Sequence, residues 1–224
     1  MSETTDITPL PKLAILGGTG KEGPGLAMRW AKAGYPVLIG SRQAEKAQAT
    51  AAELNQKLGI TTIDGYENAE AARKADICVL TVVYTAHQEA LTGLKEALQG
   101  KILVDATARI DFRNPLPPPP PSAARLAQEL LGNGVRVVAA FQNVPAHTLR
   151  KDLDQPLDLD VLVCADDLEA AEQVIRLAKN GGMRALYAGN LDNAIVVEGL
   201  TALVISINQH YKVKAASVAI TGVK

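Results

Sequence analysis

The 224-residue chain is poor in the residue types that mark several protein classes. It has only two cysteines, Cys78 and Cys164, and each lies inside an apolar run. We therefore expect buried, reduced thiols on strands rather than a disulfide framework or a metal pair. The 23 basic and 24 acidic residues are interspersed and leave a net charge of −1. This balance excludes the clustered basic face that nucleic-acid-binding proteins carry.

Signals for export and membrane insertion are also missing. The sequence predicts no apolar run of the ~18 residues that a transmembrane helix requires. The first six residues, Met-Ser-Glu-Thr-Thr-Asp, are polar and lack the apolar core of a signal peptide. We therefore expect a cytoplasmic protein that does not associate with a membrane.

The common catalytic motifs are absent as well. No tyrosine is followed by Lys at the Tyr-x-x-x-Lys spacing, and neither Gly-x-Ser-x-Gly nor a metal-ligand spacing occurs. Of the three histidines, His87 is expected on the surface of a helix or at its cap, and His210 at the end of the last helix. His147 follows the end of a strand and could face a substrate. None has a recognisable acid–base partner, so we predict no catalytic side chain and no metal site.

Short apolar runs alternate with alanine-rich helical stretches from residue 12 onward, which indicates a parallel sheet covered on both faces. The predicted fold is α/β, a Rossmann-type doubly wound, mainly parallel sheet with a small C-terminal helical extension. Residues 1–140 are predicted to form the Rossmann domain, and residues 141–224 a smaller C-terminal region for substrate binding and dimerisation. Strands are expected at 13–16, 37–39, 60–63, 77–83, 102–104, 135–140, 159–164 and 183–187, and helices at 25–33, 44–58, 68–74, 86–98, 122–131, 168–179 and 193–208.

Two segments depart from this alternation. Residues 114–121 contain six prolines, which favours a stiff polyproline-type connector at the surface. The last helix, 193–208, is apolar on almost every side and should be buried from several directions. A chain of this size can supply only part of that cover, so we expect a homodimer.

The first predicted strand ends in Gly18-x-Gly20-x-x-Gly23, the dinucleotide-binding fingerprint. Gly18 allows a tight turn, Gly20 lets the backbone approach a pyrophosphate, and Gly23 lets the helix pack on the strand. The strand before it and the helix after it give the motif its required context. A Walker A loop is excluded, because Glu22 stands where that motif needs Ser or Thr after the lysine.

The end of the second predicted strand distinguishes between the two dinucleotides. NAD-binding chains usually place Asp or Glu there to hold the ribose 2′-hydroxyl. This chain has Ser41 and Arg42, with Lys46 one helical turn further on. Arg offers forked hydrogen bonding to phosphate and Lys adds a point charge. The sequence therefore predicts NADP(H).

Together these motifs resemble those of the NADPH-dependent reductases of coenzyme F420, a 5-deazaflavin. The resemblance extends along nearly the whole chain. It is carried by Leu16–Gly20, Gly25–Ala27, Gly40–Arg42 with Lys46-Ala47, Ser122–Ala124, Phe141–Ala146, Asp192-Asn193 and Val197–Thr201.

The resemblance implies a role for each candidate residue. The adenosine 2′-phosphate would be held by Thr19, Ser41, Arg42 and Lys46. Backbone groups of Gly20, Lys21 and Glu22 would follow the pyrophosphate, between the flanking glycines Gly18 and Gly23. Val82 and Ala108 would line the cofactor cleft, and Val144 and Ala146 would present backbone groups to the nicotinamide carboxamide. The C-terminal helix would complete the deazaflavin pocket and the dimer interface.

The implied activity is hydride transfer between NADP(H) and coenzyme F420. Two departures concern the second substrate: the proline-rich segment, and residues 216–222, which lack a glycine and an arginine found in many members. The residues leave two alternatives open. One is an NADP-dependent reductase of a flavin, quinone or cyclic imine, and the other is an NADP(H)-binding sensor without turnover.

Overall fold

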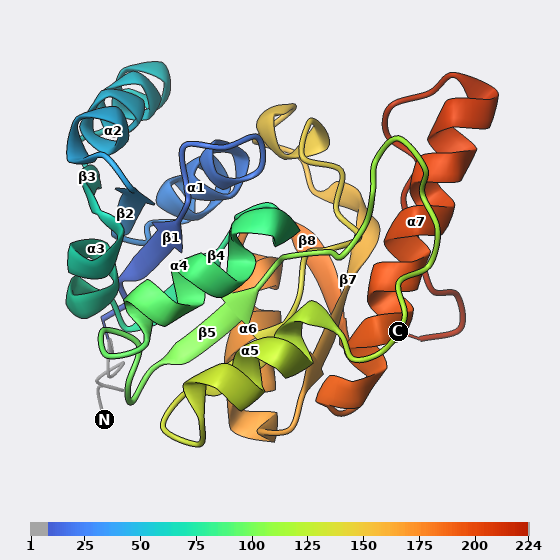
Figure 1. Cartoon of the computed structure of the whole chain (residues 1–224). Coiled ribbons are helices and arrows are strands. Elements are labelled where there is room, and N and C mark those ends of the chain that lie inside the picture. Colours follow the sequence, from blue (N-terminus) through green and yellow to red (C-terminus); the bar gives the residue numbers. More distant parts are fainter. Residues whose placement is uncertain (1–8, 224) are drawn as a thin grey trace, which may run out of the picture.

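The computed structural model describes residues 9–223, so the expectation about a signal peptide concerns residues outside this range. Eight strands alternate with helices along most of the chain (Figure 1). The strands are β1 Leu13–Leu16, β2 Val37–Ser41, β3 Ile63–Glu67, β4 Ile77–Leu80, β5 Ile102–Asp105, β6 Arg136–Ala139, β7 Leu157–Ala165 and β8 Met183–Tyr187. The helices are α1 Gly23–Lys32, α2 Ala44–Leu58, α3 Asn68–Lys74, α4 His87–Leu94, α5 Ala123–Leu131, α6 Leu168–Asn180 and α7 Ala194–Tyr211, with short 3₁₀ turns η1 Tyr84–Ala86, η2 Thr148–Arg150 and η3 Leu191–Asn193.

All eight strands form one sheet in the order β3-β2-β1-β4-β5-β6-β7-β8. The first six are parallel, β7 pairs antiparallel with β6, and β8 runs parallel to β7. The order 3-2-1-4-5-6 is that of the dinucleotide-binding folds. The predicted Rossmann-type, mainly parallel sheet is therefore confirmed.

Each face of the sheet has its own hydrophobic core, because successive strand residues point to opposite sides. Leu13 and Ile15 of β1 pack with α1, α2 and α6, whereas Ala14 and Leu16 pack with residues of α3, α4 and α5. Both cores draw residues from before and after position 140. The division into residues 1–140 and 141–224 stays a prediction.

Several element boundaries differ from those expected; β4, for example, ends at Leu80 rather than at residue 83, and two other differences are larger. Gly59 ends α2 with φ +68°, and the amide of Ile60 returns to the carbonyl of Asn55. Ile60 therefore belongs to the helix cap, and strand pairing begins only at Ile63. Residues 86–98 were expected to form one helix. In the structure η1 ends at Ala86, and α4 continues only to Leu94.

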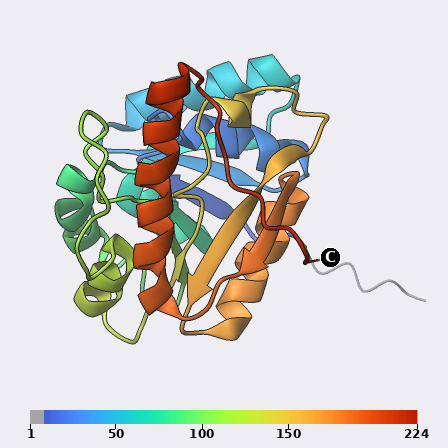
Figure 2. The ribbon, with the colours of Figure 1, turned by 90° about the vertical axis from the view of Figure 1, so that its right-hand side faces the viewer.

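Helix α7 stands at one side of the molecule, with the proline-rich segment beside it (Figures 1 and 2). Its inner face is buried, but Val196 and Leu203 are 61% and 55% exposed. The burial expected on several sides is thus not supplied by the described chain. The segment Leu191–Tyr211 is long and apolar enough to cross a membrane by length and composition, with a hydropathy of 1.4. This corrects the expectation that no apolar stretch reaches that length.

Candidate functional site

The predicted site residues all follow the carboxyl ends of parallel strands. The strand register aligns Leu16 with Leu80, Leu80 with Asp105, and Asp105 with Ala139. The glycine loop, Ser41-Arg42, Val82, Ala108 and the 141–146 segment therefore emerge at one edge of the sheet. This edge is where open α/β sheets bind their ligands.

The glycine loop is fixed by backbone contacts, and Gly23 in it has no room for a side chain. The amide of Gly18 donates to the Gly40 carbonyl at 2.8 Å, and that of Gly17 donates to Asn68 Oδ1 at 3.0 Å. A Cβ at Gly23 would lie 2.5 Å from the Gly18 carbonyl oxygen, a clash with backbone. At Gly20 the nearest atom would be 3.5 Å away, which is ordinary contact. Packing therefore requires Gly23, whereas Gly20 is exposed and has space beside it.

Helix α1 begins directly after this loop without a side-chain cap and with no acidic residue in its first turn. Its first amide groups consequently keep their capacity to bind an anion, and the helix dipole adds partial positive charge there. Pro24 occupies the start of the helix, where a missing N–H costs nothing. Lys21 is exposed beside it.

Glu22 directs its carboxyl group inward. Its Oε1 atom is buried and has no hydrogen-bond partner in the described chain. Burial raises the pKa of Glu22 from 4.5 to about 8, so the group is protonated at pH 7. The loop therefore carries no negative charge from Glu22 at the position where the sequence predicts a pyrophosphate.

Ser41, Arg42 and Lys46 lie at the end of β2 and the start of α2. Ser41 is buried, and its Oγ atom accepts a 3.3 Å hydrogen bond from the Gln43 amide. Arg42 and Lys46 are exposed, and neither forms an ion pair within residues 9–223. Two unpaired cations near a helix N-terminus are unfavourable without an anion between them.

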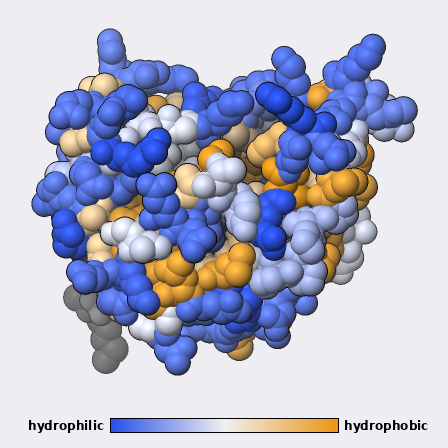
Figure 3. Space-filling view, viewed as in Figure 1, coloured by the Kyte–Doolittle hydropathy of each residue, from blue (hydrophilic) through white to orange (hydrophobic). Residues whose placement is uncertain are grey.

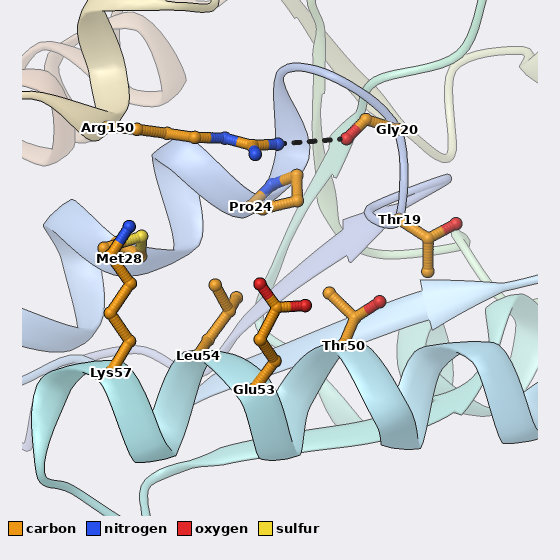
Figure 4. A pocket seen from close by; sticks show the side chains of 9 residues that line it. All are labelled: Thr19, Gly20, Pro24, Met28, Thr50, Glu53, Leu54, Lys57 and Arg150. Carbon is orange, nitrogen blue, oxygen red and sulfur yellow. Dashed lines mark hydrogen bonds between the residues drawn. The ribbon is translucent and has the colours of Figure 1, made fainter.

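A cavity of about 160 Å³ lies between the loop, α1 and α2 (Figure 4). Thr19 and Gly20 of the predicted site line it. It also exposes groups that the sequence reasoning missed, above all Lys57 and Arg150. The Arg150 guanidinium donates to the Lys21 carbonyl at 3.0 Å and approaches that of Gly20 at 3.5 Å. Arg150 lies 130 residues from the loop, so no local pattern could have indicated this contact.

A buried guanidinium holds the segment that carries Arg150. Arg29 of α1 is 3% exposed and donates to carbonyls on both sides of Arg150, those of Leu149 at 3.0 Å and Lys151 at 2.9 Å. It also reaches the carbonyls of Gln155 and Gly181. These bonds fix η2 against α1 and place Arg150 over the glycine loop.

Near the middle of the same edge, the residues that follow β4 and β5 are joined through Val82 and Thr107. The Thr107 hydroxyl donates to the Val82 carbonyl at 3.4 Å, and the Thr107 amide donates to Asp105 Oδ1 at 3.0 Å. Val82 and Ala108 are half-buried on either side of this contact. They therefore lie near each other at this edge, and their place in a cofactor cleft stays a prediction.

The expectation for His87 was wrong. Its side chain is 3% exposed, and Nε2 lies 2.7 Å from Asp105 Oδ2. The helix α4 carries it inward because Leu91 and Leu94 share its buried face. His87 satisfies the buried Asp105, which in turn orients Thr107. The pair thus holds in place the residues that follow β5.

The segment after β6 turns sharply at Phe141, whose φ is +75°. Such a conformation in a non-glycine residue is strained and is often found next to functional sites. Phe141 is held in place by an edge-to-face contact with Trp30, 5.7 Å between ring centroids. Val144 is buried, Ala146 is half-buried, and His147 is exposed beyond them.

No group of three or more potential metal ligands occurs among the described residues. Both cysteines are buried and free, as expected. Burial raises the pKa of Cys78 to about 12 and that of Cys164 to about 11. Neither thiol is ionised near neutral pH, so neither is a nucleophile there.

The chain is similar to known proteins over nearly its whole length. The family described as "NADP oxidoreductase coenzyme F420-dependent" matches residues 12–109. An F420-dependent NADP reductase of Methanocaldococcus jannaschii is 42% identical, with 95% of this chain and 99% of that protein covered. One from Methanothermobacter marburgensis is 40% identical over 94% of this chain and 98% of that protein.

Solved structures extend the likeness to the fold. A putative F420-dependent NADP reductase from Arthrobacter superposes with a TM-score of 0.78 at 26% identity. The superposition covers 94% of this chain and 99% of that one. The sequence identities over nearly the full length show that the chain belongs to the family of F420-dependent NADP reductases.

Proposed function

We propose that this protein transfers hydride between NADP(H) and coenzyme F420. One observation carries the cofactor assignment: the uncapped N-terminus of α1 and the unpaired cations Arg42 and Lys46 lie at the same edge of the sheet. That edge offers backbone donors for a pyrophosphate and charged donors for a 2′-phosphate. Family membership and the names of the relatives support the deazaflavin as second substrate.

The residues present fit NADP(H). We assign the 2′-phosphate to Thr19, Ser41, Arg42 and Lys46, and the pyrophosphate to the backbone of Gly18, Gly20, Lys21, Glu22 and Gly23. Val82 and Ala108 would line the cleft towards the nicotinamide, and backbone groups of Val144 and Ala146 would hold its carboxamide. When bound together, nicotinamide and deazaflavin supply the hydride donor and acceptor. The work of the chain is then to bind and align two rings and to exclude water.

We further propose a homodimer through the open face of α7. Val196, Leu203 and Ile207 are exposed on that face, and Figure 3 shows a hydrophobic area on the side of the molecule where α7 lies. The inner face carries Glu198, which is fully buried against the rest of the chain. A partner copy rather than a membrane therefore suits this helix, in keeping with a cytoplasmic enzyme.

The proposal is tested by mixing the purified protein with NADPH and coenzyme F420 and following the absorbance of the oxidised deazaflavin. Loss of that absorbance with matching oxidation of NADPH is expected. The same assay with a flavin, a quinone and a cyclic imine addresses the alternative substrates. Tight NADPH binding without turnover of any acceptor would instead identify a sensor.

A further inference from the structure

Glu198 is a buried acid to which the proposed chemistry assigns no role. It lies on the inner face of α7, and its side chain is fully buried. Oε1 accepts a 2.6 Å hydrogen bond from the amide of Ala123, and Oε2 accepts a 3.1 Å bond from the amide of Arg109. One carboxyl group therefore joins residues that are 75 and 89 positions away in the sequence.

These two amides are the two ends of one surface segment. Arg109 follows Ala108 of the predicted cleft, and Ala123 is the first residue of α5. Between them runs segment 109–123, which contains the proline-rich residues 114–121. Glu198 thus fixes both ends of the segment, one shortly after β5 and the other at the start of α5.

The segment is also closed on itself. The Arg109 guanidinium donates to the carbonyls of Pro119, at 2.8 Å, and Pro121. The guanidinium carbon lies 5.1 Å from the centre of the Tyr84 ring, within cation–π range. Further along, Gln209 of α7 donates to the Phe112 carbonyl at 3.1 Å. These contacts hold the segment between α7 and the turn after β4 (Figure 2).

The position of the segment points to the second substrate. It starts at the nicotinamide end of the proposed cleft, far along the sheet edge from Ser41 and Arg42. It exposes Phe112 and Leu116, and the neighbouring Val83 and Tyr84 are exposed as well. Large apolar side chains beside a cleft suit a flat, partly apolar ring such as a deazaflavin.

We propose that Glu198 is a positioning residue that clasps both ends of segment 109–123 and thereby sets the affinity for the second redox substrate, not for NADP(H). This inference rests on the proposed function only for the identity of that substrate. The clasp itself is a property of the substrate-free chain. A carboxyl group is suited to it because it offers two acceptor oxygens to two backbone donors.

The first experiment measures hydrogen exchange of the backbone amides in the substrate-free protein. Glu198→Gln retains one acceptor but turns an NH₂ group towards the other amide. The amides of Arg109 or Ala123 should then exchange at least about ten-fold faster, whereas those of β1 and β4 stay protected. Glu129→Gln, on the exposed side of α5, is the matched control and should behave as the parent.

The second experiment measures the kinetic constants of the same variants. Glu198→Gln should raise KM for coenzyme F420 about ten-fold or more and leave KM for NADPH within about two-fold. Arg109→Met removes the guanidinium bonds to Pro119 and Pro121 and should likewise raise KM for coenzyme F420 but not KM for NADPH. This variant keeps the test available if Glu198→Gln folds poorly. Unchanged exchange at both amides, or an equal rise in both KM values, would overturn the proposal.

The two experiments separate the failure of the clasp from the failure of the proposed function. A parent protein that does not reduce coenzyme F420 would refute the proposed function. The exchange measurement needs no substrate, and it alone would then decide the clasp.

Discussion

Replacing Glu22 by Gln should stabilise the protein at neutral pH. Burial raises the pKa of this carboxyl group in the folded chain to about 8 from 4.5. At pH 7 folding must therefore take up a proton that the unfolded chain does not carry. Each of the roughly 2.5 pH units between 4.5 and 7 corresponds to about 1.4 kcal/mol, which gives an upper limit of about 3.4 kcal/mol.

The raised pKa determines how the stability difference between parent and variant changes with pH. A group whose pKa is higher in the folded state favours folding most below its unfolded pKa of 4.5, and that contribution is lost as the pH rises towards 8. The Gln variant has no proton to gain or lose. Its stability advantage should be near zero at pH 4.5, grow through pH 7, and level off above pH 8. Since Glu22 is half-buried as a whole residue, we expect about 1–3 kcal/mol at pH 7.

The measurement is urea unfolding of parent and variant at intervals between pH 4.5 and 9. Glu53→Gln is the control, because Glu53 lines the neighbouring cavity but is exposed. Equal stabilities at all pH values, or a variant less stable than the parent at pH 7, would refute the reasoning. Equal stabilities would mean that the carboxyl group titrates as it does in the unfolded chain, and a less stable variant would mean that the ionised carboxylate has a partner in the folded protein.

Three further predictions concern binding, assembly and chemistry. NADP(H) should bind at least about ten-fold more tightly than NAD(H), and Arg42→Ala should remove most of that preference in titrations with both cofactors, because a charged hydrogen bond to phosphate contributes about 1.5–3 kcal/mol. An equal loss for both cofactors would contradict the 2′-phosphate assignment. Light scattering at micromolar concentration should give the mass of a dimer, and the charged variant Leu203→Glu should shift it towards the monomer. His147→Asn should keep its NADPH affinity and turn over within about ten-fold of the parent, because the proposed site aligns two cofactors; a thousand-fold fall would indicate loss of a general acid.

The fold was predictable because its signals are local. The apolar run at each strand, the helical period of residues 44–58 and the Gly18–Gly23 spacing are each readable within about fifteen residues. The position of the phosphate loop at the carboxyl edge follows from parallel topology alone. The structure adds why the loop needs Gly23, because a Cβ there would lie 2.5 Å from the Gly18 carbonyl oxygen.

The contacts that complete the site join residues far apart in sequence, and they were missed for that reason. Arg29 reaches carbonyls more than 120 positions away, and Arg150 reaches the loop from 129 positions away. His87 looked like an ordinary surface residue of a helix, since its partner Asp105 is identified only by how α4 packs on β5. The open face of α7 was indicated by composition, but composition cannot tell which of its apolar residues stay uncovered.

The charges at the carboxyl edge show why an anion can bind there although three acids lie within it. Asp105 is paired with His87, Glu198 accepts bonds from two backbone amides, and Glu22 keeps a proton at pH 7. All three are buried or directed inward, so each is compensated by a partner or a proton. The cations at the same edge, Arg42, Lys46 and Arg150, reach solvent instead. These exposed cations are therefore the groups at this edge that can attract an approaching phosphate. The same arrangement implies that ionising Glu22 above pH 8 would place a negative charge in the phosphate loop, so the stability of the loop and its affinity for a dinucleotide phosphate should decline over the same pH range.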